Sequence, residues 1–290
     1  MKRVGILTSA QFATGHPEDA PLFAALSQRG LTWFPRDWRT ASGRWSDADG
    51  WLIRTTWDYW RHPGEYNAML GDAEKSGVRF WNPPLLAQWN MDKRYLVDLA
   101  NRGIDVVPTL VLDETARARA AMVREGWEHA VLKPAISAAG WQTHRVTRDD
   151  VDERERSTRA EVGGTPLLVQ PFVSEIERGG ELSLLFVEGE FCHAVSKVPA
   201  PGEFRVQEVY GGIFAQARPT RKTIQAAARV LGAIPTGAAP LYARIDGVLL
   251  EERFLLMEAE LLEPSFFFPH GPETAVRLAA AVATRLEQPS

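Results

Sequence analysis

The sequence predicts an α/β protein in which an open parallel sheet comes first and antiparallel hairpins follow. In the N-terminal third, short apolar runs alternate with amphipathic segments, which is the pattern of a parallel sheet with connecting helices. In the C-terminal third, apolar runs come in pairs separated by short polar turns, which indicates hairpins. A chain of 290 residues is long enough for two or three domains with ample core.

The composition is typical of a globular protein and excludes several classes of function. Apolar residues make up 45% and charged residues 24% of the chain, and a net charge of −4 gives no basic surface for nucleic acid. The lone Cys192 rules out an internal disulfide and is typical of a reducing compartment. No apolar stretch is long enough to span a membrane. We therefore expect a cytoplasmic protein that binds neither nucleic acid nor membrane.

The first elements are strands that alternate with helices. Short apolar runs predict strands at residues 4–7, 50–53 and 78–81. Apolar residues at helical spacing predict helices at residues 19–30 and 63–75.

A polar and aromatic segment follows the second of these strands. In open parallel sheets, ligands bind beyond the carboxyl ends of the strands, which is where this segment lies. Packed turn aromatics explain such a stretch equally well. The candidate substrate contacts are Arg54, Thr55, Trp57, Asp58 and Tyr59.

The middle of the chain contains a loop of small residues between two strands. Residues 134–141 follow a predicted strand at 130–133, and small side chains let backbone N–H groups approach phosphate oxygens closely. On its own this loop is a weak signal. The remaining predictions here are helices at 90–103, 114–125 and 145–161, the last one solvated, and strands at 106–112 and 167–173.

The last third begins with a hairpin and ends with a helix. Residues 181–187 and 190–197 predict two strands around a tight turn, and residues 220–231 and 272–287 have the apolar spacing of helices.

Between these helices, residues 242–260 read as a second hairpin with a polar turn around Glu252. Because side chains alternate along a strand, Asp246 is expected opposite Glu258 and Arg244 opposite Glu260, all on one face. The other face is expected to carry the apolar residues Ile245, Leu249, Leu255, Met257 and Leu261.

Three carboxylates on one face repel one another unless a cation offsets the repulsion. A hard divalent cation such as Mg²⁺ does so, and it usually takes a few carboxylates together with substrate phosphates. The alternative is a solvated acidic hairpin, which is the commoner arrangement in general.

The order of these motifs resembles the ATP-grasp superfamily, of the glutathione synthetase and RimK type. The resemblance rests on Asp92-Lys93 in a helix, Lys133-Pro134 before the small-residue loop, residues 169–173 before a Gly-Gly-Glu, and Arg244-x-Asp246 before Glu258-x-Glu260. Family members usually end this last motif in Asn, where this chain has Glu260. The resemblance implies an ATP-grasp fold with a pre-ATP-grasp α/β domain at 1–105, a central subdomain at 106–172 and a C-terminal subdomain at 173–290.

The resemblance also implies roles for individual residues. The ATP site would consist of Lys93 and Lys133 on the phosphates, Ser137 and Gly140 in the covering loop, Gln170, Phe172 and Val173 around adenine, and Glu181, or alternatively Glu177, on the ribose. Mg²⁺, with Mn²⁺ as an alternative, would be bound by Asp246, Glu258 and Glu260. Arg244 and Arg205 would stabilise charge on the transferring phosphoryl group and on the acyl phosphate that follows. Lys197 would serve at either of these two stages.

The predicted activity is ATP-dependent ligation of an amino-acid-like substrate through an acyl phosphate. Residues 81–83, 90–96 and 107–109 look most like a RimK-type bacterial subgroup, which includes the cyclo-ligase that closes O-ureido-D-serine into D-cycloserine. Related enzymes are often dimers or tetramers, so a homo-oligomer is expected. The alternatives are a non-catalytic ATP-binding module with the same fold, and a two-lobed small-molecule binding protein without an ATP site.

Overall fold

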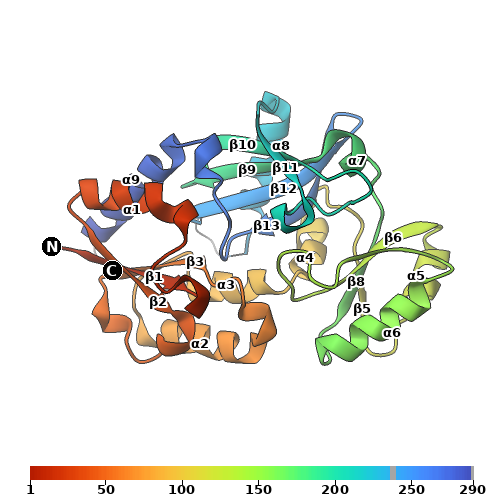
Figure 1. The fold of residues 1–290 in the computed structure, drawn as a ribbon, viewed down its shortest axis with the longest axis horizontal. Helices are drawn as coiled ribbons and strands as arrows, with labels where there is room; N and C mark the ends of the chain where they lie inside the picture. The colour runs from red at the N-terminus through yellow and green to blue at the C-terminus, as the bar shows by residue number, and fades with distance from the viewer. Residues whose placement is uncertain (236–239, 289–290) are drawn as a thin grey trace.

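The computed structural model describes residues 1–235 and 240–288, and three sheets organise these residues (Figure 1). The fold is mixed α/β, with one parallel and two antiparallel sheets, as the sequence predicts.

The first sheet is parallel, with the order β2-β1-β3-β4. Its strands are β1 (Arg3–Thr8), β2 (Thr32–Asp37), β3 (Gly50–Thr55) and β4 (Phe80–Trp81). Helix α1 (Ala20–Gln28) and the C-terminal helix α9 (Glu273–Glu287) share one apolar cluster with the sheet, and α2 (Pro63–Ser76) shares another. Strand β2 was not predicted. It contains Pro35, which is tolerated because β2 is an edge strand. The proline and the polar residues beside it interrupt the apolar run by which the other strands were predicted.

The second sheet is antiparallel, with the order β5-β8-β6-β7, and lies in the lobe on the right of Figure 1. Its elements are β5 (Leu110–Leu112), α5 (Ala118–Arg124), β6 (His129–Pro134), β7 (His144–Thr147), α6 (Val151–Val162) and β8 (Leu167–Pro171). The helix predicted at 145–161 begins as strand β7, and the strand predicted at 106–112 pairs in this sheet only from Leu110 onward. Val106 instead makes an isolated bridge to Leu256.

The third sheet is antiparallel, with the order β11-β10-β9-β12-β13, and carries the acidic hairpin. Its strands are β9 (Glu181–Val187), β10 (Glu190–Val198), β11 (Ile213–Ala217), β12 (Tyr242–Leu250) and β13 (Arg253–Glu260). Two helices, α4 (Tyr95–Asn101) and α8 (Arg221–Gly232), pack against it in one apolar cluster. The short helices α3 (Pro84–Met91) and α7 (Glu175–Gly179) complete the set that Figure 1 labels.

The chain crosses back to the first sheet after β13. Residues 261–267 hydrogen-bond to side chains of the N-terminal sheet region, and α9 then packs on α1. Apolar residues far apart in sequence therefore share one core, including Leu22, Leu26, Leu278 and Val282. Within the described part of the chain, no helix combines the length and apolarity that crossing a bilayer demands.

Candidate active site

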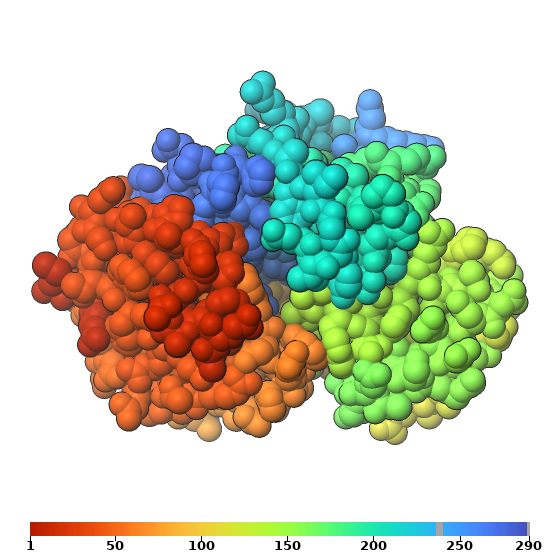
Figure 2. All heavy atoms as spheres, in the orientation of Figure 1, coloured from red at the N-terminus to blue at the C-terminus, as the bar shows by residue number. Residues whose placement is uncertain are grey.

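A cavity of about 590 Å³ lies where the three sheets meet, and residues from 16 to 270 line it. The space-filling view shows a hollow at this junction, between the N-terminal lobe and the lobes of the other two sheets (Figure 2). Its walls carry most of the residues that the sequence singles out. The predicted residues that line it are Trp57, Tyr59, Lys93, Lys133, Ser137, Gly140, Gln170, Phe172, Val173, Glu181, Lys197, Arg205, Arg244, Asp246, Glu258 and Glu260.

The acidic hairpin has the pairing that alternation predicts: Arg244 lies opposite Glu260, and Asp246 lies opposite Glu258. The register depends on two features that compensate. The turn contains only Glu251 and Glu252, both with positive φ, and a bulge between Asp246 and Gly247 restores the expected pairing.

Two apolar residues lie elsewhere than predicted, one beside the bulge and one beside the turn. Met257, predicted to face away from the acidic side, lines the cavity. Leu249, predicted to be core, is 39% exposed because it lies close to the turn.

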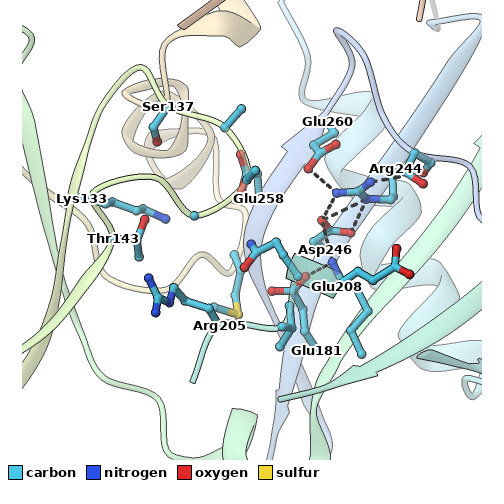
Figure 3. A pocket seen from close by; sticks show the side chains of 18 of the residues that line it. Lys133, Ser137, Thr143, Glu181, Arg205, Glu208, Arg244, Asp246, Glu258 and Glu260 are labelled. Carbon is cyan, nitrogen blue, oxygen red and sulfur yellow. Dashed lines mark hydrogen bonds and ion pairs between the residues drawn. The ribbon is translucent and has the colours of Figure 1, made fainter. Parts of the chain in front are cut away.

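Arg244 lies between two of the carboxylates (Figure 3). Its Nη2 donates to Asp246 Oδ2 at 2.9 Å, and it also donates to Glu260. Burial opposes the charge on Asp246, but Arg244 and Lys197 outweigh it and lower the pKa of this carboxyl. Burial raises the pKa of Glu260 well above its usual range, because Arg244 only partly offsets the neighbouring carboxylates.

Lys197 is buried against two carboxylates. Its ammonium pairs with Glu181 and lies 3.4 Å from Asp246 Oδ2. Burial opposes its charge, but Asp246 and Glu181 outweigh burial and raise the pKa of Lys197. This lysine is therefore a fixed cation on the cavity wall.

Two further lysines face the hairpin from the other lobes. Lys93 Nζ lies 3.1 Å from Glu258 Oε1 and donates to the carbonyl of Ser137 at 2.5 Å. Lys133, at the end of β6, has its pKa lowered by burial. Burial likewise opposes the charge on Glu258, but Lys93 and Lys133 lower its pKa below the usual range. Lys93 and Lys133 thus converge on the ionised carboxylate of Glu258, and one positive charge is left over. Such a site suits a phosphate ligand with a metal ion.

The small-residue loop after β6 approaches a second loop across the cavity mouth. Gly140 has φ +71°, and a Cβ there would lie 3.1 Å from both Gln207 Oε1 and the Tyr210 ring. Trp141 stacks on Trp60 of the N-terminal lobe with ring centroids 4.3 Å apart. The loop is therefore fixed on one side, and a side chain at position 140 would strain the backbone and crowd the opposite loop.

The second loop carries Arg205. Its guanidinium donates two hydrogen bonds to the Glu203 carboxylate, the shorter at 2.6 Å, and lies 3.6 Å from the centroid of the Tyr210 ring. Hydrogen bonds from Arg205 lower the pKa of Glu203 to about 2. Arg205 is thereby oriented toward the cavity, opposite the Arg244 group in Figure 3.

The apolar end of the cavity lies beside β8. Gln170 Nε2 donates to Thr109 Oγ1 at 2.8 Å, and Phe172 and Phe204 form an edge-to-face pair with centroids 6.1 Å apart. Such a slot accepts a flat heterocycle. The structure separates the two ribose candidates: Glu181 lines the cavity, whereas Glu177 is exposed outside it and pairs with Arg145 at 2.7 Å.

Three predicted substrate contacts lie outside the cavity. Arg54 is fully buried, with Nη2 2.7 Å from Asp19 Oδ1 and Nη1 donating to the carbonyl of Pro264 at 2.8 Å. Thr55 is buried within β3, and Asp58 accepts hydrogen bonds from Trp38 and Arg39. The sequence locates this segment at a strand end, but it does not show which side chains turn away from the cavity. Trp57 and Tyr59 do reach the cavity.

Other cavity residues were missed. His16 and Glu18 follow β1, and Glu263, Ser265 and His270 follow β13. Glu18 accepts from the Ser265 hydroxyl at 2.6 Å and from the Phe267 N–H at 2.7 Å, so the two loops form one wall. The sequence did contain a signal for His16 and Glu18, because residues 9–19 lie beyond the carboxyl end of the first strand. Ligands bind beyond the carboxyl ends of the strands in open parallel sheets, and the same rule selected Arg54.

The donor set suits a metal ion that arrives with a phosphate ligand. Among the described residues, no group of three His, Cys, Asp or Glu side chains is arranged to hold an ion by itself. Mg²⁺ characteristically takes one or two carboxylates and completes its shell with phosphate oxygens and water. Asp246 and Glu258 carry the lowered pKa values that such ligands need.

Comparison with known proteins agrees with this geometry. Residues 4–82 match the family model of the D-cycloserine synthetase DcsG N-terminal domain, and residues 101–239 match that of the prokaryotic glutathione synthetase ATP-grasp domain. The cycloserine biosynthesis protein DcsG of Streptomyces lavendulae is 29% identical over 98% of this chain and 100% of that protein.

Solved structures show the same relationship. The crystal structure of D-cycloserine synthetase DcsG superposes with a TM-score of 0.87 and 26% identity, covering 98% of this chain and 100% of that one. D-alanine–D-alanine ligase from Bacillus anthracis in complex with ATP shares the fold with a TM-score of 0.72 at 16% identity, over 99% of this chain and 97% of that one. The chain therefore belongs to the ATP-grasp superfamily of ADP-forming carbon–nitrogen ligases.

Proposed function

We propose that this protein uses ATP to activate the carboxylate of an amino-acid-like substrate and joins it to a nitrogen of the same molecule. The supporting observation is the cavity itself, where three lysines, two arginines and the acidic hairpin face a wall contributed by the N-terminal lobe. That lobe matches DcsG, whose printed name is D-cycloserine synthetase, and the match extends over the whole chain. O-ureido-D-serine is accordingly the first substrate to test.

The nucleotide would occupy the side of the cavity formed by the second and third sheets. Phe172 and Val173 would contact adenine, Gln170 would lie beside it, and Glu181 would accept from the ribose hydroxyls. The phosphates would be bound by the ammonium groups of Lys93 and Lys133 and by backbone N–H groups around Ser137 and Gly140. Both kinds of donor are suited to phosphate oxygens. Mg²⁺ would be held by Asp246 and Glu258, with Glu260 as a third carboxylate, and when bound it supplies charge neutralisation on the phosphates.

Activation of the substrate needs cations on the transferring group. The substrate carboxylate attacks the γ-phosphorus, ADP leaves, and the product is an acyl phosphate. Arg244 and Arg205 would stabilise the charge that develops, with Lys197 as a further fixed cation. The contact between Gly140 and residues 207–210 would exclude water, which otherwise hydrolyses the intermediate.

The test measures ADP release with Mg²⁺ and ATP against ureido-amino acids, amino acids and dipeptides, with mass spectrometry of the products. We expect turnover with one member of the panel, and Glu258→Gln is expected to lower it about 100-fold or more. Glu252→Gln, an exposed glutamate in the turn of the same hairpin, is the matched control and should turn over like the wild type. An inactive wild type that still binds ATP tightly would instead favour a non-catalytic ATP-binding module.

Three further predictions remain to be measured. The domain boundaries near 105 and 172 are testable by limited proteolysis. A homo-oligomer, as dimer or tetramer, is testable by light scattering, and a cytoplasmic location by fractionation.

A further inference from the structure

The cavity contains a buried carboxyl group that the mechanism above does not use. Glu263 follows β13, lines the cavity, and is only 7% exposed. In the described part of the chain, its side chain forms no ion pair, and its own backbone N–H favours the ionised form of the carboxyl group. A carboxyl group buried without a cationic partner costs stability, and a functional role would offset that cost.

The backbone that carries Glu263 is fixed on both sides. Trp57 Nε1 donates to the Glu263 carbonyl at 3.0 Å, and Arg54 Nη1 donates to the next carbonyl, that of Pro264, at 2.8 Å. On the preceding side, Tyr242 donates to the Leu262 carbonyl at 3.1 Å. The backbone that carries the carboxyl group is therefore held in place by the N-terminal lobe and by β12, and such positioning is what a catalytic group requires.

The surroundings of Glu263 bring the pKa of its carboxyl group close to neutral pH. Burial raises the pKa of Glu263 to about 7, and Lys93 and Arg244 offset this only in part. A group with such a pKa accepts a proton efficiently near neutral pH. The ionisable groups that interact with it electrostatically are Lys93, Arg244, Glu258, Glu260 and the phenols of Tyr59, Tyr66 and Tyr242.

We propose that Glu263 is the general base that accepts the proton of the attacking nitrogen in the second half of the reaction. This inference rests on the proposed function. The nitrogen lone pair attacks the acyl carbon, the new C–N bond forms, and the C–O bond to phosphate breaks. Inorganic phosphate leaves with the electron pair, and the N–H proton passes to the Glu263 carboxylate and from there to solvent.

The cavity places this carboxyl group suitably for the second half of the reaction. Glu263 interacts with Lys93 and Arg244, the residues assigned to the phosphates, and also with Tyr59 from the N-terminal wall. All four residues line the same cavity, so an acyl phosphate bound between Tyr59 and the two cations would lie beside Glu263. The competing role for Glu263 is an ionic contact to the ammonium group of the substrate, which would act on binding and leave the chemical step unchanged.

The experiment separates the two halves of the reaction in wild type, Glu263→Gln and Glu263→Asp. Hydroxylamine traps an acyl phosphate as a hydroxamate without assistance from a base, so it reports the first half alone. We expect Glu263→Gln to lower kcat for the native product about 100- to 10,000-fold, the usual contribution of general base catalysis. Hydroxamate formation and ADP release with hydroxylamine should stay at the wild-type level, and Glu263→Asp should recover part of the activity.

The pH profile gives an independent readout. In the wild type, kcat should rise with pH through about 7, because the base must be ionised, and this limb should be absent in Glu263→Gln. A Glu263→Gln enzyme with a raised KM and an unchanged kcat would overturn the proposal in favour of ammonium binding. Loss of hydroxamate formation would overturn it as well, because Glu263 would then act in the first half. A wild type that forms neither hydroxamate nor product would refute the proposed function, and the inference with it.

Discussion

Replacing Arg54 tests whether this residue stabilises the fold or contacts substrate. Arg54→Met removes the guanidinium from a fully buried site and leaves the carboxylate of Asp19 without its partner. Burial opposes the charge of Arg54, but Asp19 more than offsets burial and raises the pKa of the guanidinium, so Arg54 stays charged in the fold. Removing one partner of a buried ion pair typically costs about 3–5 kcal/mol.

The magnitude follows from what the side chain contacts. Besides Asp19, Arg54 donates to the Pro264 carbonyl at 2.8 Å, and its guanidinium lies 4.5 Å from the centroid of the Phe266 ring. With about 2–4 °C of melting temperature per kcal/mol for a large domain, the expected decrease is about 6–20 °C. The double variant Asp19→Asn/Arg54→Met should regain part of the loss, because no charge is left unpaired.

The assay is thermal unfolding followed by circular dichroism, with urea unfolding alongside. Arg124→Met is the matched control, since Arg124 is exposed and its pair with Glu125 is worth no more than about 1 kcal/mol. A melting temperature equal to that of the wild type, together with a raised KM for the substrate, would refute the structural role.

Other predictions concern the loops, the hairpin and pH. Gly140→Val should raise the KM for ATP about 10-fold or more, because φ is +71° and the added atoms meet Gln207, at a cost of about 1–3 kcal/mol; an unchanged KM would show that the two loops do not close together. Gly247→Ala should destabilise the protein by about 1–3 kcal/mol in urea unfolding, since the new Cβ lies 2.4 Å from the Leu255 carbonyl oxygen, and equal stability would contradict this packing. In the unliganded protein, Glu263→Gln should raise the melting temperature at pH 8 relative to the wild type and not at pH 4. The folded state holds the Glu263 proton up to pH about 7, whereas the unfolded state releases it near pH 4.5. The wild type therefore loses stability as the pH rises between these values. An equal difference in melting temperature at both pH values would contradict a buried, protonated carboxyl group.

The hairpin and the lysines could be predicted from the sequence, because their chemistry depends on local alternation. Arg244 and Asp246 differ by two positions, so they share a face whatever the surrounding fold. Lys133 lies near the end of an apolar strand, just before Pro134, which locates its side chain where the strand leaves the sheet. The bulge beside Gly247 could not be predicted, and the correct register resulted from its offset against the two-residue turn.

The N-terminal contacts were harder to predict because they depend on which residues lie opposite one another in the fold. Arg54 and Trp57 are three positions apart, yet Arg54 turns into the core toward Asp19 while Trp57 reaches the cavity. Glu263 gave no sequence signal, since it follows Leu261-Leu262 and reads as a strand end. Its backbone carbonyl is held by a hydrogen bond from Trp57, which is 206 residues away along the chain.

The packing of α9 on α1 has a consequence for how the protein folds as it is synthesised. The N-terminal sheet leaves the ribosome first, but Leu22 and Leu26 of α1 share their apolar cluster with Leu278 and Val282 of α9. That face of the lobe stays open to water until α9 has been made, and only then can the cluster close. Ribosome-bound chains that end before residue 272 should therefore depend on chaperones, and emergence of α9 from the ribosome should be the step that makes the first lobe resistant to protease.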